Sequence, residues 1–236
     1  MAPAAQAEEA LVAVASNFAE PANALSEAFT HTTGHSVLIS SGSTGRLYAQ
    51  VVQGAPFDVF MAADAVRPAR LEAEGLAIPG STRTYATGRL ALWVHAAGVE
   101  PPLRRLTTGH YRRLALANPD LAPYGAAAVQ VLNRLDLADE AADRQVFGEN
   151  IAQTFSFVAT GNADLGFVAL AQVNRPGRAT AGQYDVIPAH WHAPIRQDAV
   201  LLLHGADNPA ALAWLEFLTS PAAHDILAAY GYEPGA

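Results

Sequence analysis

Three consecutive segments between residues 11 and 64 decide the fold: LVAVASNF at 11–18, VLISSGSTGRLYAQVVQG at 37–54 and VFMAAD at 59–64. Each opens with an apolar run of strand length and leads through polar residues toward a stretch with helical spacing of apolar residues. After Asn17 this spacing extends through Phe29 and is expected to end at Gly34, after the loop at 40–45 it stops at Gly54, and after Asp64 it ends near Gly75. A strand, a loop and a helix repeated three times predict a parallel α/β sheet.

The same alternation begins again near Arg89. Apolar runs and helical spacing predict further strands at 90–94, 114–116, 165–170 and 200–203, and helices at 126–135, 150–160, 209–218 and 221–230. Two α/β series with a helical pair at the end predict two lobes, between which the chain crosses more than once. We assign residues 10–86 and 205–236 to the first lobe, and residues 87–204 to the second.

The amino-acid composition excludes several kinds of catalytic mechanism and ligand. The chain has 236 residues and a formal charge of −8, and all 14 of its basic residues are arginines. The lack of lysine excludes a P-loop and Schiff-base mechanisms, and the lack of cysteine excludes thiolate nucleophiles, disulfides and cysteine-ligated metals. An acidic chain without a basic run is not expected to bind nucleic acid or anionic lipid. No apolar stretch reaches the 18 residues or so that a membrane-spanning helix needs.

The N-terminal residues suggest export from the cytoplasm. The sequence AAQA at 4–7 is similar to the small-residue tail of a signal-peptide cleavage site. An ordinary irregular N-terminus explains the same composition, so both interpretations stay open at this point.

Three loops place hydroxyl, amide or bare backbone groups directly before a predicted helix. They lie at 15–17, 41–45 and 122–125, and a weaker fourth lies at 150–151. A helix N-terminus has unpaired N–H donors and a partial positive charge, and both favour a bound anion. Gly42 and Gly45 would let the backbone approach a ligand closely. The alternative is that these polar residues are only helix N-caps.

Enzyme signatures are weaker. Ser43 lies in S-x-S-x-G and not in the G-x-S-x-G of a nucleophile elbow. Eight histidines leave a serine–histidine–aspartate triad open, but no spacing points to one. These patterns favour a binding protein that is not an enzyme and needs no cofactor, and a serine hydrolase stays open at this point.

A family resemblance makes the ligand specific. The order of LVAVASNF at 11–18, SSGSTGRLYAQVVQGAPFDVFMAAD at 40–64, NPDLAPYG at 118–125, GNADLGFVAL at 161–170 and SPAAHDILAAYGY at 220–232 resembles the periplasmic molybdate-binding proteins of ABC-type transporters. This implies the type II periplasmic-binding-protein fold, with two α/β lobes around a cleft that encloses a tetrahedral oxyanion. Each lobe would be a mixed, mostly parallel sheet flanked by helices.

The resemblance also implies the ligand-binding residues. In this family hydroxyls and backbone N–H groups hold the oxyanion, without a metal-cation ligand, and the matching positions are Ser16, Asn17, Ser43, Thr44, Tyr124 and the backbone of Ile151. The sequence departs from the family pattern at two positions. Thr44 stands where serine is usual, and Ala169 stands where many members have a tyrosine. Tyr124 can supply the missing phenol from another direction.

The function implied is capture of molybdate or tungstate in the periplasm, by a monomer, for delivery to an ABC permease in the inner membrane. A site made only of donors suits a fully deprotonated dianion. Hydrogen phosphate would bury an unmatched O–H at a cost of about 1–3 kcal/mol. The alternatives are a binder of sulfate or another tetrahedral oxyanion, a cytoplasmic ligand-sensing domain of the same fold, and a serine hydrolase.

Overall fold

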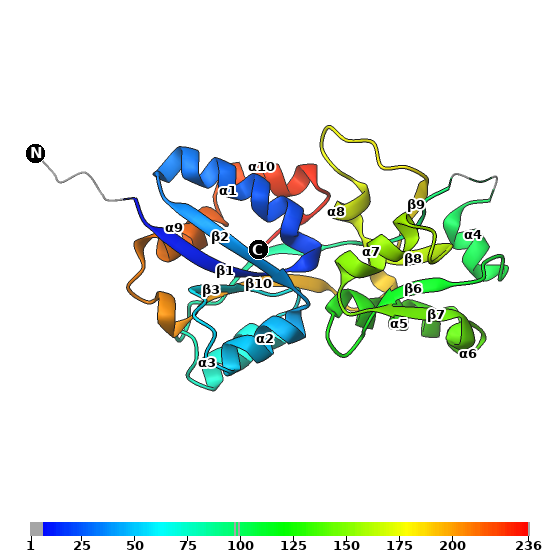
Figure 1. Ribbon diagram of the computed structural model, residues 1–236, viewed down its shortest axis with the longest axis horizontal. Helices are drawn as coiled ribbons and strands as arrows, with labels where there is room; N and C mark the ends of the chain where they lie inside the picture. Colours follow the sequence, from blue (N-terminus) through cyan, green and yellow to red (C-terminus); the bar gives the residue numbers. More distant parts are fainter. Residues whose placement is uncertain (1–6, 97, 99, 236) are drawn as a thin grey trace, which may run out of the picture.

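Two β-sheets, each with helices packed on both faces, lie side by side in the computed structural model, which describes residues 7–96, 98 and 100–235 (Figure 1). The predicted signal-peptide remnant at 4–7 falls mostly on residues 1–6, outside the described residues. Among the described residues, no helix is long and apolar enough to cross a bilayer.

The first sheet has six strands. In spatial order they are β11 (Glu233–Pro234), β4 (Arg83–Gly88), β10 (Ile195–Leu201), β3 (Val59–Met61), β1 (Glu9–Ala15) and β2 (Ser36–Gly42). Its helices are α1 (Ala19–Thr33), α9 (Pro209–Phe217) and α10 (Pro221–Ala229) on one face, and α2 (Thr44–Val52) and α3 (Val66–Ala73) on the other. Side chains alternate between the two faces of β1, where Val12 and Val14 contact the α1 side and Ala13 contacts the α2 side.

The second sheet has five strands. In spatial order they are β7 (Gln145–Gly148), β6 (Leu114–Ala117), β8 (Leu165–Ala169), β5 (Leu90–Val94) and β9 (Gln183–Val186). Its helices are α7 (Ile151–Ala159) and α8 (Leu170–Val173) on one face, and α4 (Pro102–Thr107), α5 (Pro123–Arg134) and α6 (Ala138–Ala141) on the other. Between the sheets' elements lie short 3₁₀ turns, among them η1 (Ser16–Phe18), directly after β1, and η3 (Ala189–Trp191), before β10.

Helix α1 shows how local sequence sets these elements. Leu25 and Phe29 recur at helical spacing and are fully buried, and Phe29 packs edge-on against Trp214 of α9. The helix ends at Gly34, which takes a left-handed φ of 79° and donates its N–H to the carbonyl of Thr30. A glycine C-cap of this kind is the usual signal of a helix end, so the predicted boundary is correct.

The strand directions agree with the predicted mixed, mostly parallel sheets. β1 is parallel to β2 and β3, and β6 is parallel to β7 and β8, while the other neighbouring pairs are antiparallel. Strands β1, β2, β3 and β4 therefore run in one direction in the first sheet, and β6, β7, β8 and β9 do so in the second. Among the strands that run the other way, β5 and β10 receive the chain just after it crosses between the lobes. They run away from the cleft, while β1, β2, β6 and β7 run toward it.

The predicted return of the chain at residue 205 comes too late. β10 begins at Ile195 and is hydrogen-bonded to β3 and β4 of the first sheet, so this strand does not belong to the second lobe. The sequence obscured it because Arg196, Gln197 and Asp198 interrupt the apolar run, although Gln197 and Asp198 are both buried. The predicted first crossing, after residue 86, comes slightly too early, since β4 continues to Gly88.

Candidate functional site

Four loops meet between the two sheets, at the carboxyl ends of β1, β2, β6 and β7. Ligands of open α/β sheets bind at such strand ends. The loops line one small pocket with about 180 Å³ of space free of protein atoms, too small for a drug-sized organic ligand. Its lining contains all six residues predicted from the sequence, Ser16, Asn17, Ser43, Thr44, Tyr124 and Ile151, together with Ala15, Ala63, Ala122 and Pro123.

The side chains that line the pocket are uncharged, and the six predicted residues among them are buried. Each of the six predicted residues is buried, with exposed fractions between 1% for Thr44 and 8% for Ser16. None of the ten lining residues carries a charged side chain. A ligand enclosed here would be bound by dipoles alone, and in a low-dielectric site these interact more strongly than in water.

Ser43 is the clearest donor. It is the N-cap residue of α2, yet its side chain makes no capping hydrogen bond, and its buried Oγ has no partner within the described chain. Buried hydroxyls are normally hydrogen-bonded, so an unpartnered one needs an explanation. The N-cap explanation fails at this position. It holds instead for Asn150, whose side chain accepts a hydrogen bond of 3.0 Å from the N–H of Gln153.

Tyr124 contributes a second unpartnered hydroxyl from the opposite lobe. Its phenol oxygen is buried and makes no hydrogen bond of normal geometry among the described residues, although the Tyr232 hydroxyl and the Asn17 side chain lie close enough to affect its pKa. Burial raises the pKa of Tyr124 well above the ordinary value of 10.0, so the group stays protonated and able to donate. The phenol of Tyr124 reaches across to the first sheet, where a Cβ on Gly88 would overlap it. Because glycine has no Cβ, Gly88 leaves the space that the Tyr124 hydroxyl occupies.

Thr44 and Asn17 present donors in different ways. The Oγ1 of Thr44 accepts a hydrogen bond of 3.2 Å from the N–H of Ala63, which leaves its own hydrogen free to donate. Both amide hydrogens of Asn17 are used elsewhere, since its Nδ2 donates to Gln197 Oε1 at 2.8 Å and to Tyr232 Oη at 3.0 Å. Asn17 is therefore left with its backbone N–H as a donor for the pocket.

Ile151 stands at the first turn of α7, where N–H groups have no partner inside the helix. The carbonyl of Asn150, in the same peptide unit as the Ile151 N–H, accepts hydrogen bonds of 3.1 Å and 3.0 Å from Thr154 N and Oγ1. A buried side chain that the sequence did not single out, Gln172, donates to the Ile151 carbonyl at 3.2 Å. These contacts fix the orientation of the peptides around Ile151.

The lobes touch around the pocket. The N–H of Gly45 donates to the carbonyl of Leu121 at 2.9 Å, and Arg46 pairs with Glu149 at 3.1 Å. A Cβ on Gly45 would lie 3.1 Å from the Cα of Leu121. The glycine therefore serves the close approach of the two lobes rather than the approach of a ligand, which corrects the reason given from the sequence. Ligand enclosed here is contacted from both lobes, as in a closed cleft.

The hydrolase alternative finds no support. Ser43 Oγ has no hydrogen-bond partner in the described chain, so no histidine activates it. The histidine ring contacts that the structure describes go to Glu8, Glu100, Ala193 and Asp58, and not to Ser16. The described residues also contain no group of three side chains suited to hold a metal cation.

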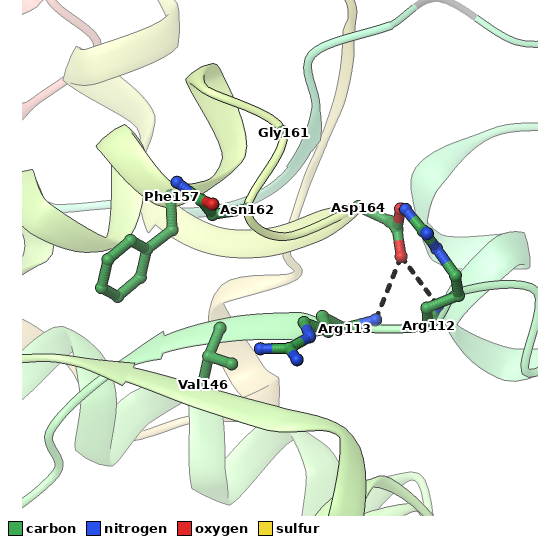
Figure 2. A pocket seen from close by; sticks show the side chains of 7 residues that line it. All are labelled: Arg112, Arg113, Val146, Phe157, Gly161, Asn162 and Asp164. Atoms are coloured by element: carbon green, nitrogen blue, oxygen red, sulfur yellow. Dashed lines mark hydrogen bonds and ion pairs between the residues drawn. The ribbon is translucent and has the colours of Figure 1, made fainter.

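A larger pocket, with about 1150 Å³ of space free of protein atoms, lies in the second lobe, near the start of β6 and β8 and away from the cleft (Figure 2). Its polar lining is charged and exposed: Arg112 pairs with Asp164 at 3.0 Å, and Asp164 also accepts from the N–H groups of Arg112 and Arg113. Partial burial opposes ionisation of Asp164, but these hydrogen bonds hold its pKa below the ordinary value. None of the residues that line this pocket has a buried polar atom without a partner in the described chain, unlike Ser43 and Tyr124 in the cleft.

Two α/β lobes that close over a buried pocket of neutral donors define a ligand-binding protein of the periplasmic-binding type. The chain belongs to the bacterial extracellular solute-binding protein family, whose model matches residues 10–233. This membership confirms the predicted fold class and the prediction of a binding protein that is not an enzyme.

Two relatives to which this chain is plainly similar are named as molybdate-binding proteins. The chain is 49% identical over 230 residues to the molybdate-binding protein ModA of Azotobacter vinelandii, an alignment that covers 97% of this chain and 91% of that protein. It is 45% identical to the molybdate-binding protein ModA of Rhodobacter capsulatus, with 97% and 89% covered. The solved structure of the Azotobacter vinelandii periplasmic molybdate-binding protein superposes with a TM-score of 0.90 at 41% identity, covering 94% of this chain and 98% of that one.

Proposed function

We propose that this protein captures molybdate or tungstate in the pocket between its lobes and delivers the oxyanion to an ABC import permease in the inner membrane. Its family and its relatives named as molybdate-binding proteins support this function. The oxyanion is cargo, held by Ser16, Asn17, Ser43, Thr44, Tyr124 and Ile151, and no cofactor takes part.

One observation carries the proposal: two buried hydroxyls without partners, one from each lobe, line the same pocket. Ser43 Oγ comes from the start of α2 and the Tyr124 hydroxyl from the start of α5. Leaving a buried donor unsatisfied costs about 1–3 kcal/mol, which a bound acceptor would recover. About seven charge-assisted hydrogen bonds at about 1.5–3 kcal/mol each would offset the costs of association and lobe ordering.

The donor set also explains which anions fit. A fully deprotonated tetrahedral dianion offers only acceptors, and every polar group that the pocket presents can donate. Hydrogen phosphate needs an acceptor for its proton. The carboxylate of Glu149, at the rim of the pocket, is paired with Arg46, and Asp64 is paired with Arg67. Phosphate could donate its O–H only to a hydroxyl of the pocket, which would then no longer donate to the ligand, so phosphate should bind less tightly than a fully deprotonated dianion.

Delivery follows from closure. Ligand contacts from both lobes stabilise the closed form by differential affinity, and a permease that distinguishes closed from open protein receives only the loaded form. We place the protein in the periplasm as a monomer, after removal of an export signal. The description of its family as extracellular argues against the alternative of a cytoplasmic sensing domain.

Parallel calorimetric titrations with molybdate, tungstate, sulfate and phosphate test this function. We expect tight binding of molybdate and tungstate, with a dissociation constant between about 1 μM and 1 nM, and weaker binding of phosphate. Sulfate has the same charge and shape but is smaller, so cavity size alone must exclude it. Tighter binding of sulfate than of molybdate or tungstate would make sulfate the ligand of this pocket. No binding of any oxyanion would refute the proposal.

A further inference from the structure

A buried chain of hydrogen bonds links the first loop of the pocket to two segments far along the chain. Asn17 contacts Gln197, which lies 180 residues away on β10, and Tyr232, which lies 215 residues away beside β11. All three side chains are buried, with Gln197 0% and both Asn17 and Tyr232 4% exposed. Gln197 and Tyr232 are not lining residues of the pocket.

The donors and acceptors in this chain can be arranged in only one way. Gln197 Nε2 donates to the carbonyl of Ile195 at 3.0 Å, and a carbonyl can only accept. This fixes Gln197 Oε1 toward Asn17, so the amide nitrogen of Asn17, and not its oxygen, must face Gln197. The same nitrogen donates to the hydroxyl of Tyr232, and that hydroxyl donates back to the carbonyl of Asn17 at 3.1 Å.

Residue 17 is thereby held at two points. Its side chain is anchored to β10, and its carbonyl is anchored to the C-terminal segment. Burial raises the pKa of the Tyr232 phenol above its ordinary value, so this hydroxyl remains a donor. With the side chain and the carbonyl both restrained, the backbone of Asn17 keeps one orientation at the wall of the pocket.

The same chain adjoins the phenol that comes from the other lobe. A Cβ built on Gly88 would overlap the Tyr124 hydroxyl and lie 3.2 Å from Gln197 Nε2, so these two groups meet over Gly88. Gly88 ends β4 just before the first crossing, and Gln197 lies near the start of β10, which begins at Ile195 just after the return crossing. The anchor of Asn17 is therefore built where both crossing segments leave the first sheet.

We infer that Gln197 and Tyr232 are positioning residues of the oxyanion pocket, which hold the Asn17 backbone N–H toward the ligand without touching the ligand themselves. This inference rests on the proposed function. It predicts that affinity for the oxyanion depends on two side chains outside the pocket, and that both act through Asn17.

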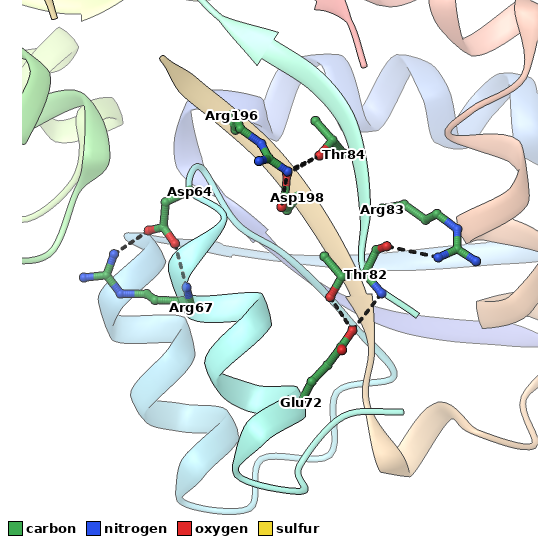
Figure 3. A network of polar contacts seen from close by, with 8 residues as sticks. All are labelled: Asp64, Arg67, Glu72, Thr82, Arg83, Thr84, Arg196 and Asp198. Atoms are coloured by element: carbon green, nitrogen blue, oxygen red, sulfur yellow. Dashed lines mark hydrogen bonds and ion pairs between the residues drawn. The ribbon is translucent and has the colours of Figure 1, made fainter. Parts of the chain in front are cut away.

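The test compares two adjacent buried residues of β10. Gln197→Met keeps the length of the side chain and removes its hydrogen bonds. The control is Asp198→Asn, because Asp198 is 1% exposed and bonds Thr84 at 2.8 Å and Arg196 at 3.2 Å, away from the pocket (Figure 3). We expect Gln197→Met to weaken molybdate binding about tenfold in calorimetry, as expected for loss of one hydrogen bond. Asp198→Asn should leave the affinity unchanged, even if it lowers the melting temperature.

A coupling measurement separates positioning from general stability. Asn17→Ala keeps the backbone N–H but removes the amide that Gln197 holds, so adding Gln197→Met to it should weaken binding no further. Tyr232→Phe, which removes only one hydroxyl, serves if Gln197→Met does not fold, and it should also weaken binding about tenfold. A tenfold loss that persists in the Asn17→Ala background, or unchanged affinity in both single variants, would overturn the inference while the proposed function stands. A wild-type protein that binds no oxyanion would remove both.

Discussion

The starts of α2 and α7 look alike in the sequence but differ in the structure. Each has a polar residue, Ser43 or Asn150, at the N-cap position directly after a strand that runs toward the cleft. Asn150 satisfies the N–H of Gln153, whereas Ser43 satisfies nothing and keeps its hydroxyl unpartnered in the pocket. One residue caps its helix and the other is available to a ligand. The unpartnered group, and not the polar residue type, marks the site.

Replacing Ser43 should give the largest effect on binding. Ser43→Ala removes a charge-assisted hydrogen bond, so molybdate affinity should fall roughly 10- to 100-fold. The free energy of unfolding without ligand should not fall, because the hydroxyl has no partner to lose. Calorimetry and urea denaturation of the same samples measure the two quantities. A loss of stability of the size expected for a lost N-cap would contradict the distinction between the two helix starts.

Replacing Asn150 should give the opposite pattern. Asn150→Ala removes the cap of α7 and should lower the free energy of unfolding by about 1 kcal/mol. Affinity should fall much less than in Ser43→Ala, since the Asn150 carbonyl stays bonded to Thr154 and continues to orient the Ile151 N–H. Urea denaturation and calorimetry again give both numbers. If Asn150→Ala reduced the free energy of binding by more than it reduced the free energy of unfolding, Asn150 would be a ligand-binding residue, as proposed for Ser43.

Changing the pH should have the smallest effect. The pocket lining has no acidic or basic side chain, and burial raises the pKa of Tyr124 well above 10.0. A raised phenol pKa means that the neutral donor persists as pH rises, so molybdate affinity should change less than about twofold between pH 7 and pH 9. Calorimetry at three pH values checks this expectation. A steep fall near pH 8 would reveal a titrating group at the pocket.

The same shift affects stability at higher pH. Tyr124, Tyr85 and Tyr232 all have raised pKa values in the folded protein because they are buried. Their contribution is fully present below pH 10 and is lost as pH rises above it, since the unfolded chain then releases these protons first. The chain has no lysine that would titrate in the same range. Tyr124→Phe should therefore reduce the alkaline loss of stability.

The sequence predicted the elements with a strong local signal. Gly34 and Gly54 stand at or just beyond the ends of α1 and α2, and the apolar spacing of α1 is the face that it buries. Strands β4, β7, β9 and β11 were not predicted, because a short strand depends on its neighbours more than on its own residues. β10 was placed late for the same reason: its polar residues find their partners on β4, at Asn17 and within β10 itself.

For the site, the sequence determined which residue types line the pocket. An acidic chain without lysine or cysteine, with hydroxyl- and glycine-bearing loops before its helices, leaves neutral donors for binding a small anion. Only the tertiary structure decided which of those donors are free. Ser43 and Asn150 differ by their partners, and Asn17 loses its amide to Gln197 and Tyr232. Hydrogen-bond partners this far apart in the chain leave no local pattern, because they are set by the way the two sheets and the crossing strands pack.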